Sequence, residues 1–159
     1  MAAYTDKSLV YLDETGCEEF YSPQYVYSKI GVKVDVEVPG RKFTRTNIVA
    51  GLLNGKIIGE MLYKTNMNSE LFEPYFERIF LPAIPKGSVV IMDNATFHRK
   101  NKLKEIALKF NCTILFLPPY SPDLNPIEKK WANLKKWLRK NSKLFNSFFD
   151  AIMSYFKTN

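Results

Sequence analysis

Histidine and cysteine are scarce in this chain of 159 residues, and their scarcity argues against several kinds of site. With a single histidine, His98, a zinc site or a serine–histidine–aspartate triad is disfavoured. Two cysteines, Cys17 and Cys112, cannot form a disulfide framework, which fits a reducing compartment. A glycine-rich loop of the nucleotide-phosphate-binding type is also missing. The acidic residues are therefore the first candidates for chemistry.

Long apolar runs are absent as well. None approaches the ~18 residues of a membrane-spanning helix, and residues 1–14 lack the basic and apolar regions of a signal peptide. We therefore expect a cytoplasmic protein with no membrane partner. The length predicts a single domain over residues 1–159, and 12 phenylalanines and nine tyrosines predict an aromatic-rich core.

Positive charge is unevenly distributed along the chain. Residues 95–143 hold 12 lysines and arginines against three acids, which are Glu105, Asp123 and Glu128. The formal net charge of the whole chain is +7, so the remainder is slightly acidic. A concentrated basic region indicates a polyanionic partner such as nucleic acid, although an idle basic surface fits the charge equally well.

The pattern of apolar residues predicts an α/β fold with a mixed sheet and helices on both faces. Buried strands are expected at 8–12, 89–92 and 113–117, and a half-exposed strand at 32–38. Asn54-Gly55 lies between two further strand patterns, 46–53 and 56–63, and predicts a two-residue hairpin turn. Helical spacing covers 68–81, 98–110, a segment beginning at Pro126, and 144–156.

Two aspartates, Asp13 and Asp93, come directly after predicted strands. Strand ends in an open α/β sheet are where functional sites are built. A strand-end aspartate can equally well cap a turn or a helix.

Glu128 lies in the first turn of the helix that begins near Asn125-Pro126. One interpretation is a capping box, with Asn125 as the N-cap and Glu128 three residues later. The helical periodicity of ~100° per residue supports a second interpretation, in which Glu128 belongs to a functional site. It places Glu128 beside the buried stripe, in one row with Ala132, Lys135 and Arg139, where a carboxylate could meet a substrate phosphate.

Three converging carboxylates repel one another, and divalent cations relieve that repulsion. Phosphodiester cleavage by two metal ions needs hard oxygen ligands of this kind. Mg²⁺ prefers such oxygen sites. We therefore predict that Asp13, Asp93 and Glu128 hold two divalent ions, Mg²⁺ or Mn²⁺, and act in phosphoryl transfer.

The chain resembles the catalytic domain of mariner-superfamily transposases, in the bacterial insertion-sequence branch. The resemblance covers roughly residues 7–140 and rests on three motifs: Leu12-Asp13-Glu14, then Met92-Asp93-Asn94-Ala95 with His98, then Leu117-Pro-Pro-Tyr-Ser-Pro-Asp-Leu-Asn-Pro-Ile-Glu128. Residues 94–127, 34 in all, separate Asp93 from Glu128, which is the spacing of this branch.

The resemblance implies a ribonuclease-H-like fold of about five strands, related to retroviral integrases. It assigns Asp13, Asp93 and Glu128 to a catalytic, metal-binding DDE triad. The implied activity is cleavage of DNA at transposon ends and strand transfer into target DNA, in a bacterial cytosol or nucleoid. It also implies a homodimer in the active complex, or a partner polypeptide that carries the DNA-binding part.

Two features set this sequence apart from full-length relatives. Those carry helix-turn-helix domains before the first catalytic aspartate, whereas Asp13 lies near the start here, so we expect no such domain in this chain. The residues expected to contact DNA are then basic or polar ones of the catalytic domain: Arg41, Lys42, Arg45, His98, Arg99, Lys135 and Arg139. Alternatives are a resolvase- or ribonuclease-H-like nuclease, and a truncated remnant that binds DNA without cutting it.

Overall fold

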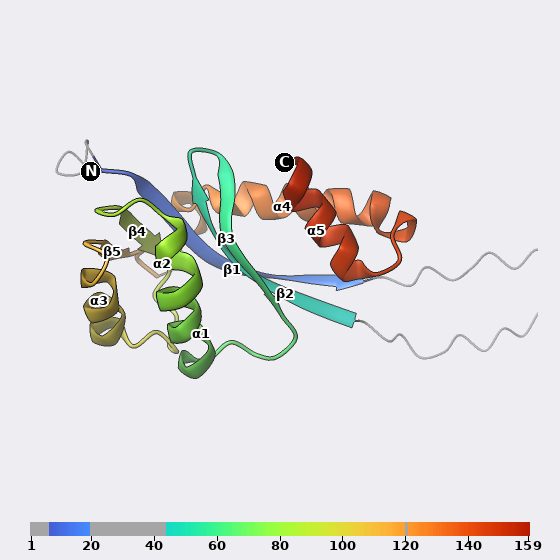
Figure 1. Cartoon of the computed structure of the whole chain (residues 1–159). Coiled ribbons are helices and arrows are strands. Elements are labelled where there is room, and N and C mark those ends of the chain that lie inside the picture. The colour runs from blue at the N-terminus through green and yellow to red at the C-terminus, as the bar shows by residue number, and fades with distance from the viewer. Residues whose placement is uncertain (1–6, 20–43, 120) are drawn as a thin grey trace, which may run out of the picture.

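A five-stranded mixed sheet forms the centre of the protein (Figure 1). The computed structural model describes residues 7–19, 44–119 and 121–159. The strand order is β3-β2-β1-β4-β5, with β1, β4 and β5 parallel and β2 and β3 antiparallel to their neighbours. The predicted mixed sheet of about five strands is confirmed. The strand expected at 32–38 lies outside the described residues.

Strand β1 (Leu9–Glu19) is much longer than predicted. Its first four residues, Leu9–Leu12, pair in parallel with β4 (Val89–Met92). From Asp13 onward it continues beyond β4, paired with β2 (Thr44–Leu53). The prediction that Asp13 ends its strand was therefore wrong, because antiparallel pairing extends β1 through residues that are not a continuous apolar run.

The hairpin predicted at Asn54-Gly55 is confirmed. These two residues connect β2 to β3 (Lys56–Tyr63), and both have positive φ, 49° and 79°. Such a pair is the preferred two-residue turn, since its twist matches that of the strands.

The helical segment predicted over 68–81 consists of three consecutive pieces. These are α1 (Ser69–Tyr75), a π-helical stretch (Phe76–Phe80) and α2 (Leu81–Ala83). Asn68 caps the start, because its side chain accepts a hydrogen bond of 2.9 Å from the amide of Leu71. The helical segment includes Pro82 and stops after Ala83.

The remaining elements alternate strand and helix. Strand β4 is followed by α3 (Lys100–Leu108) and then β5 (Thr113–Phe116). A 3₁₀ turn (Pro122–Leu124) leads into α4 (Ile127–Asn141). After a second 3₁₀ turn (Ser142–Leu144), α5 (Phe148–Thr158) closes the described chain.

The last helix begins later than predicted. Ser147 caps it, since the Ser147 hydroxyl accepts a hydrogen bond of 3.0 Å from the amide of Asp150. Leu144 belongs to the preceding turn and is 79% exposed, so the start predicted at residue 144 was wrong.

Two apolar cores lie on the two faces of the sheet, as the alternation of side chains along a strand requires. α1, α2 and α3 pack on the face that carries Val10, Leu12 and Val90. α4 and α5 pack on the face that carries Cys17, Ile48 and Ala50. Figure 1 shows the two helical groups on opposite sides of the strands. The predicted buried stripe of α4 is confirmed and comprises Ile127, Trp131, Leu134 and Leu138. No helix among the described residues is long and apolar enough to cross a membrane.

The packing of α4 on the sheet predicts unequal effects of two leucine substitutions. Leu134, on the buried face of α4, is completely buried, whereas Leu108 on α3 is 70% exposed. We expect Leu134→Ala to lower the free energy of unfolding by about 2–5 kcal/mol, because the deletion leaves a cavity. Leu108→Ala is the matched control and should change it by less than about 0.5 kcal/mol. Urea denaturation followed by circular dichroism measures both, and equal effects would contradict the described packing.

Candidate active site

Asp13 and Asp93 are neighbours because β1 and β4 run in parallel. The last paired residues are Leu12 and Met92, so each aspartate is the next residue along its strand. Beyond this point β4 ends, while β1 continues with β2 as its partner among the described residues. The two carboxylates therefore lie where the parallel part of the sheet ends.

Glu128 reaches the same place from the start of α4. The Asn125 side chain accepts a hydrogen bond of 3.4 Å from the amide of Ile127, the first residue of α4, while Pro126 occupies the N-cap position predicted for Asn125. The reciprocal bond of a capping box is not formed, because the Asn125 amide donates to the carbonyl of Pro122 at 3.0 Å. The Glu128 carboxylate is therefore available for the site.

One cavity of about 300 Å³ brings the three acids together. Asp13, Asp93 and Glu128 all line it, and the proline loop closes its rim through Pro118, Pro119, Ser121 and Pro122. The proline motif thus does more than end β5, since it forms one wall of the cavity and leads into α4. The three residues singled out in the sequence as a carboxylate triad share this cavity.

Burial and mutual repulsion dominate the electrostatics of the cavity. Burial raises the pKa of Asp13 to about 7, and the charges of Glu128 and Asp93 add to the effect. Asp13 is only 9% exposed, so water screens its charge poorly. A cation among the three carboxylates would remove this unfavourable interaction.

Two aromatic side chains hold the aspartates in place. The indole N–H of Trp131 donates to Oδ2 of Asp13 at 3.3 Å, from the buried stripe of α4. Nε2 of His98 lies 3.3 Å from Oδ1 of Asp93 and donates to it in the tautomer that carries the proton there. The His98 ring is itself fixed between Phe72 and Phe97, with centroid distances of 4.5 and 4.3 Å. Such partners orient metal-binding carboxylates.

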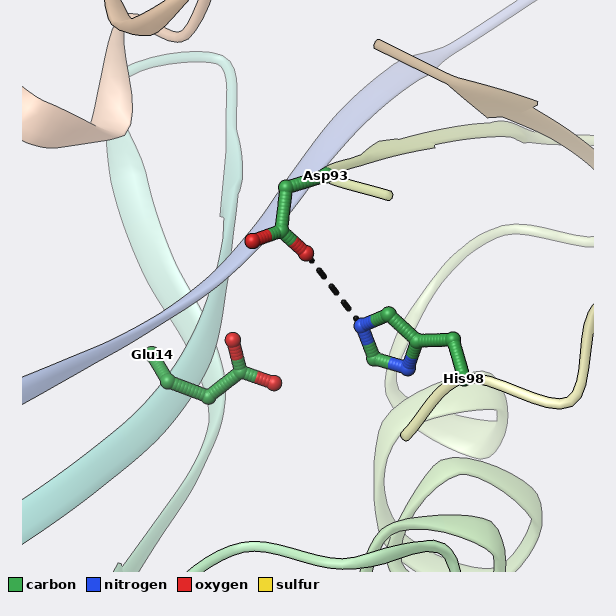
Figure 2. Close-up of side chains that lie close together, drawn as sticks. All are labelled: Glu14, Asp93 and His98. Atoms are coloured by element: carbon green, nitrogen blue, oxygen red, sulfur yellow. Dashed lines mark hydrogen bonds and ion pairs between the residues drawn. The ribbon is translucent and has the colours of Figure 1, made fainter. Parts of the chain in front are cut away.

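Glu14 approaches Asp93 from the opposite face of the sheet, because it follows Asp13 in an extended strand. Figure 2 shows Glu14, Asp93 and His98 grouped together, and one potential ligand atom from each lies within 4.8 Å of the others. Oε1 of Glu14 is buried without a hydrogen-bond partner among the described residues. Burial raises the pKa of Glu14 to about 8, with further contributions from Asp13 and Asp93.

These donors fit a hard divalent cation. Carboxylate oxygens are the ligands that Mg²⁺ and Mn²⁺ prefer. The cavity of Asp13, Asp93 and Glu128 offers only such oxygens and is open to substrate. A cation bound between Glu14, Asp93 and His98 would have to bind the histidine through Nε2. The Nδ1 atom of His98 would then carry the proton and stay buried, and no described residue accepts a hydrogen bond from it. His98 therefore suits orienting Asp93 better than binding metal.

The predicted DNA-contacting residues fall into three groups. Arg41 and Lys42 lie outside the described residues. Arg45, Lys135 and Arg139 line a second cavity, to which the β1–β2 ribbon and the C-terminal half of α4 contribute. His98 and Arg99 have other partners.

His98 and Arg99 are occupied by interactions within the protein. The side chain of His98 is completely buried against Asp93, so it faces the protein interior and not a duplex. Arg99 forms a two-bond ion pair with Glu73, at 2.6 and 2.5 Å. We therefore assign His98 to the architecture around Asp93, whereas the side chain of Arg99 is 62% exposed and its contact with DNA stays a prediction.

Trp131 and Glu14 had no functional role in the sequence interpretation. Trp131 was assigned to the core alone, and its N–H bond to Asp13 depends on the tertiary arrangement of α4. Glu14 could have been found, since an acid next to Asp13 in a strand must point to the other face of the sheet.

The buried charge of Asp13 predicts a pH-dependent effect of Asp13→Asn on stability. The folded-state pKa of about 7 lies above the ordinary 3.8, so the wild-type protein loses stability as pH rises between these values. Asparagine keeps the acceptor for Trp131 and removes the charge. In EDTA, we expect the variant to melt at least about 3 °C higher than wild type at pH 8. The gain should be clearly smaller at pH 5.

Differential scanning calorimetry at both pH values measures this difference. Asp123→Asn is the control, since Asp123 is exposed in the 3₁₀ turn and does not line the cavity. A gain that is the same at pH 5 and pH 8 would contradict a raised pKa at Asp13.

Comparison with known proteins identifies the family. The family model of the DDE superfamily endonucleases matches residues 8–148. An uncharacterized protein of Sinorhizobium fredii, y4pE/y4sA, is 38% identical over 66 residues, which cover 41% of this chain and 45% of that protein.

Solved structures agree on the fold. The Mos1 strand transfer complex superposes with a TM-score of 0.59 at 17% identity, over 94% of this chain and 52% of that one. The mariner Mos1 paired end complex with Mg superposes with a TM-score of 0.56 at 17% identity, with the same coverage of both chains. A simian T-cell lymphotropic virus intasome gives 0.54 at 14% identity, over 94% of this chain and 47% of that one.

The chain spans about half the length of these relatives. Its five-stranded sheet and flanking helices have the ribonuclease-H-like fold that was predicted. Since the family model covers most of the chain and the three acids share one cavity, this protein belongs to the DDE superfamily endonucleases.

Proposed function

We propose that this chain is the catalytic domain of a DNA transposase of the bacterial insertion-sequence branch. It cleaves DNA at transposon ends and transfers the strand into target DNA. The observation that carries the proposal is the convergence of Asp13, Asp93 and Glu128 on one cavity, in a chain that belongs to the DDE endonucleases.

The similar structures support this assignment through the metal ions that their descriptions name. Two Mos1 paired end complexes are described with Mg and with Mn. At 17–18% identity these likenesses establish the fold, and the carboxylate cavity supplies the link to chemistry in this chain.

Asp13, Asp93 and Glu128 would hold two divalent ions, Mg²⁺ or Mn²⁺. When bound, the ions supply a nucleophile at neutral pH and stabilise the leaving oxygen. The chain's own residues prepare the cavity. Trp131 and His98 fix Asp13 and Asp93 through their hydrogen bonds. The Pro118-Pro119 wall narrows the space beside the scissile phosphate. Positioning of this kind is the protein's main contribution to phosphoryl transfer.

The partners in this proposal are transposon ends and target DNA. The active assembly is a homodimer, or a complex with a separate polypeptide that recognises the ends. The chain spans about half of its relatives, so recognition of specific ends is not assigned to the described residues.

Asp93→Asn is the direct test of the triad. The amide cannot supply the charge that a divalent cation needs, so we expect cleavage of a supercoiled plasmid in Mn²⁺ to fall by at least about 1,000-fold. Isothermal titration should show Mn²⁺ binding weakened by about tenfold or more.

The matched control is Asp123→Asn, the same substitution at an exposed position outside the cavity. It should cleave like wild type. Cleavage by Asp93→Asn at the wild-type rate would overturn the triad assignment. Wild-type protein that binds no Mn²⁺ would instead favour a non-catalytic remnant.

A panel of substrates separates transposition from a general nuclease on the same fold. We expect cleavage of duplexes that carry the terminal inverted repeats of the element, with a free 3′-hydroxyl at the cut. Branched DNA and RNA–DNA hybrids should be cut at least about tenfold more slowly, because the proposed reaction takes place at duplex transposon ends. Preferential cutting of hybrids or junctions would favour the ribonuclease-H-like or resolvase-like alternative.

A further inference from the structure

Glu14 is an acid to which the proposed function gives no role. It follows Asp13 in β1, and consecutive side chains of a strand point to opposite faces, so Glu14 lies on the face of the sheet that α1 and α3 cover. Its Oε1 atom is buried and has no hydrogen-bond partner among the described residues. No lysine or arginine forms an ion pair with Glu14 within the described part of the chain. A buried carboxylate oxygen without a partner is unfavourable.

Asp93 and His98 are the neighbours of Glu14 on this face. Figure 2 shows the three side chains facing one another, and one potential ligand atom from each lies within 4.8 Å of the others. The side chain of His98 is completely buried, whereas that of Asp93 is 51% exposed. The group is therefore closed on the histidine side and open to solvent beside Asp93, which leaves a path for a small cation.

Glu14 and Asp93 are sufficient protein ligands for such a cation. Mg²⁺ is commonly bound through one or two carboxylates and keeps several of its waters. His98 need not bind the ion. Its Nε2 lies 3.3 Å from Oδ1 of Asp93 and donates to it in the tautomer that carries the proton there, so the histidine holds the carboxylate in place.

The alternative is that Glu14 stays a neutral buried acid. Burial raises the pKa of Glu14 to about 8, with contributions from Asp13 and Asp93. Protonation would remove the charge, but it would supply no partner for Oε1. A hydrated cation supplies both a compensating charge and waters that donate hydrogen bonds. The two interpretations therefore differ in whether this face of the sheet binds metal.

We propose that Glu14 and Asp93 bind a divalent cation, Mg²⁺ or Mn²⁺, on the α1 face of the sheet. We call this the Glu14–Asp93 site. It is separate from the cavity of Asp13, Asp93 and Glu128, and it needs no DNA. The ion neutralises Glu14 and fixes the carboxylate of Asp93 from the side opposite α4, so it supports the residue that both groups share.

The test uses a background in which the cavity of the three acids is disabled. Asp13→Asn with Glu128→Gln removes the two acids that belong to the cavity alone, and it keeps Asp93 and Glu14. We expect this background protein to bind a single Mn²⁺ in isothermal titration at pH 8, where carboxylates are deprotonated most readily. No Mn²⁺ binding by the folded background protein would overturn the inference and favour the neutral acid.

Glu14→Gln in the same background removes one of the two ligands. We expect it to bind Mn²⁺ at least about tenfold more weakly, since even partners outside the ligand set contribute that much to metal affinity. The matched control is Glu18→Gln, the same substitution at an exposed acid of the same strand. The control should bind within about threefold of the background protein. Equal losses in the two variants would contradict the site.

A second measurement locates the ion. His98 is the single histidine of the chain, so the proton NMR signals of its ring are free of overlap from other histidines. Bound Mn²⁺ is paramagnetic and should broaden these signals in the background protein. Mn²⁺ binding that leaves the His98 signals sharp would place the ion elsewhere and overturn the inference. Should Glu14→Gln fail to fold, Asp93→Asn replaces it in the same background, with the same expected loss of binding.

The outcomes separate this inference from the proposed function. Mn²⁺ binding by the background protein, combined with no metal-dependent cleavage by wild type, would support the Glu14–Asp93 site and reject the proposed catalysis. A background protein that binds no Mn²⁺, with wild-type cleavage that depends on Asp93, would reject the site and leave the catalysis intact.

Discussion

The repulsion that Glu128 and Asp93 exert on the buried carboxylate of Asp13 is the constraint on which the site depends. Asp13 lies under α4 with little access to water, and Glu128 and Asp93 are near enough to raise its pKa. A fold that only needed stability would replace one of these acids with an amide or an apolar side chain. Retaining all three is unfavourable without a cation, so the arrangement is informative about function where one acid would not be.

Strand β1 explains how one short segment serves two faces of the sheet. Consecutive residues of a strand point in opposite directions, so Asp13 meets α4 and Trp131 while Glu14 turns towards His98. Asp93 stands at the end of β4, where its carboxylate contributes to both groups (Figure 2). Because β1 continues beyond Asp13, the same strand also contributes Gly16 and Cys17 to the second cavity.

Sequence patterns predicted the sheet, the hairpin at Asn54-Gly55 and the buried stripe of α4, because each depends on local periodicity or turn chemistry. They misplaced the end of β1 and the start of α5, since partner strands and a serine cap set those limits. The cavity shared by Asp13, Asp93 and Glu128 followed from motif order. Motif order did not predict the hydrogen bond from Trp131, the packing of His98 or the position of Arg45. These features depend on how elements that are distant in the sequence pack together.

Helix α4 satisfies three requirements at once, and its periodicity shows how. Ile127, Trp131, Leu134 and Leu138 face the sheet and hold the helix rigidly. The adjacent row places Glu128 in one cavity and Lys135 and Arg139 in the other, so the spacing between carboxylate and cations is fixed by the helix itself. A rigid element holds such a spacing more precisely than loops could. Trp131 belongs both to the core and to the site, since its ring is buried in the core while its N–H donates a hydrogen bond to Asp13. The packing of the core, the position of Glu128 and the orientation of Asp13 thus all depend on these fifteen residues.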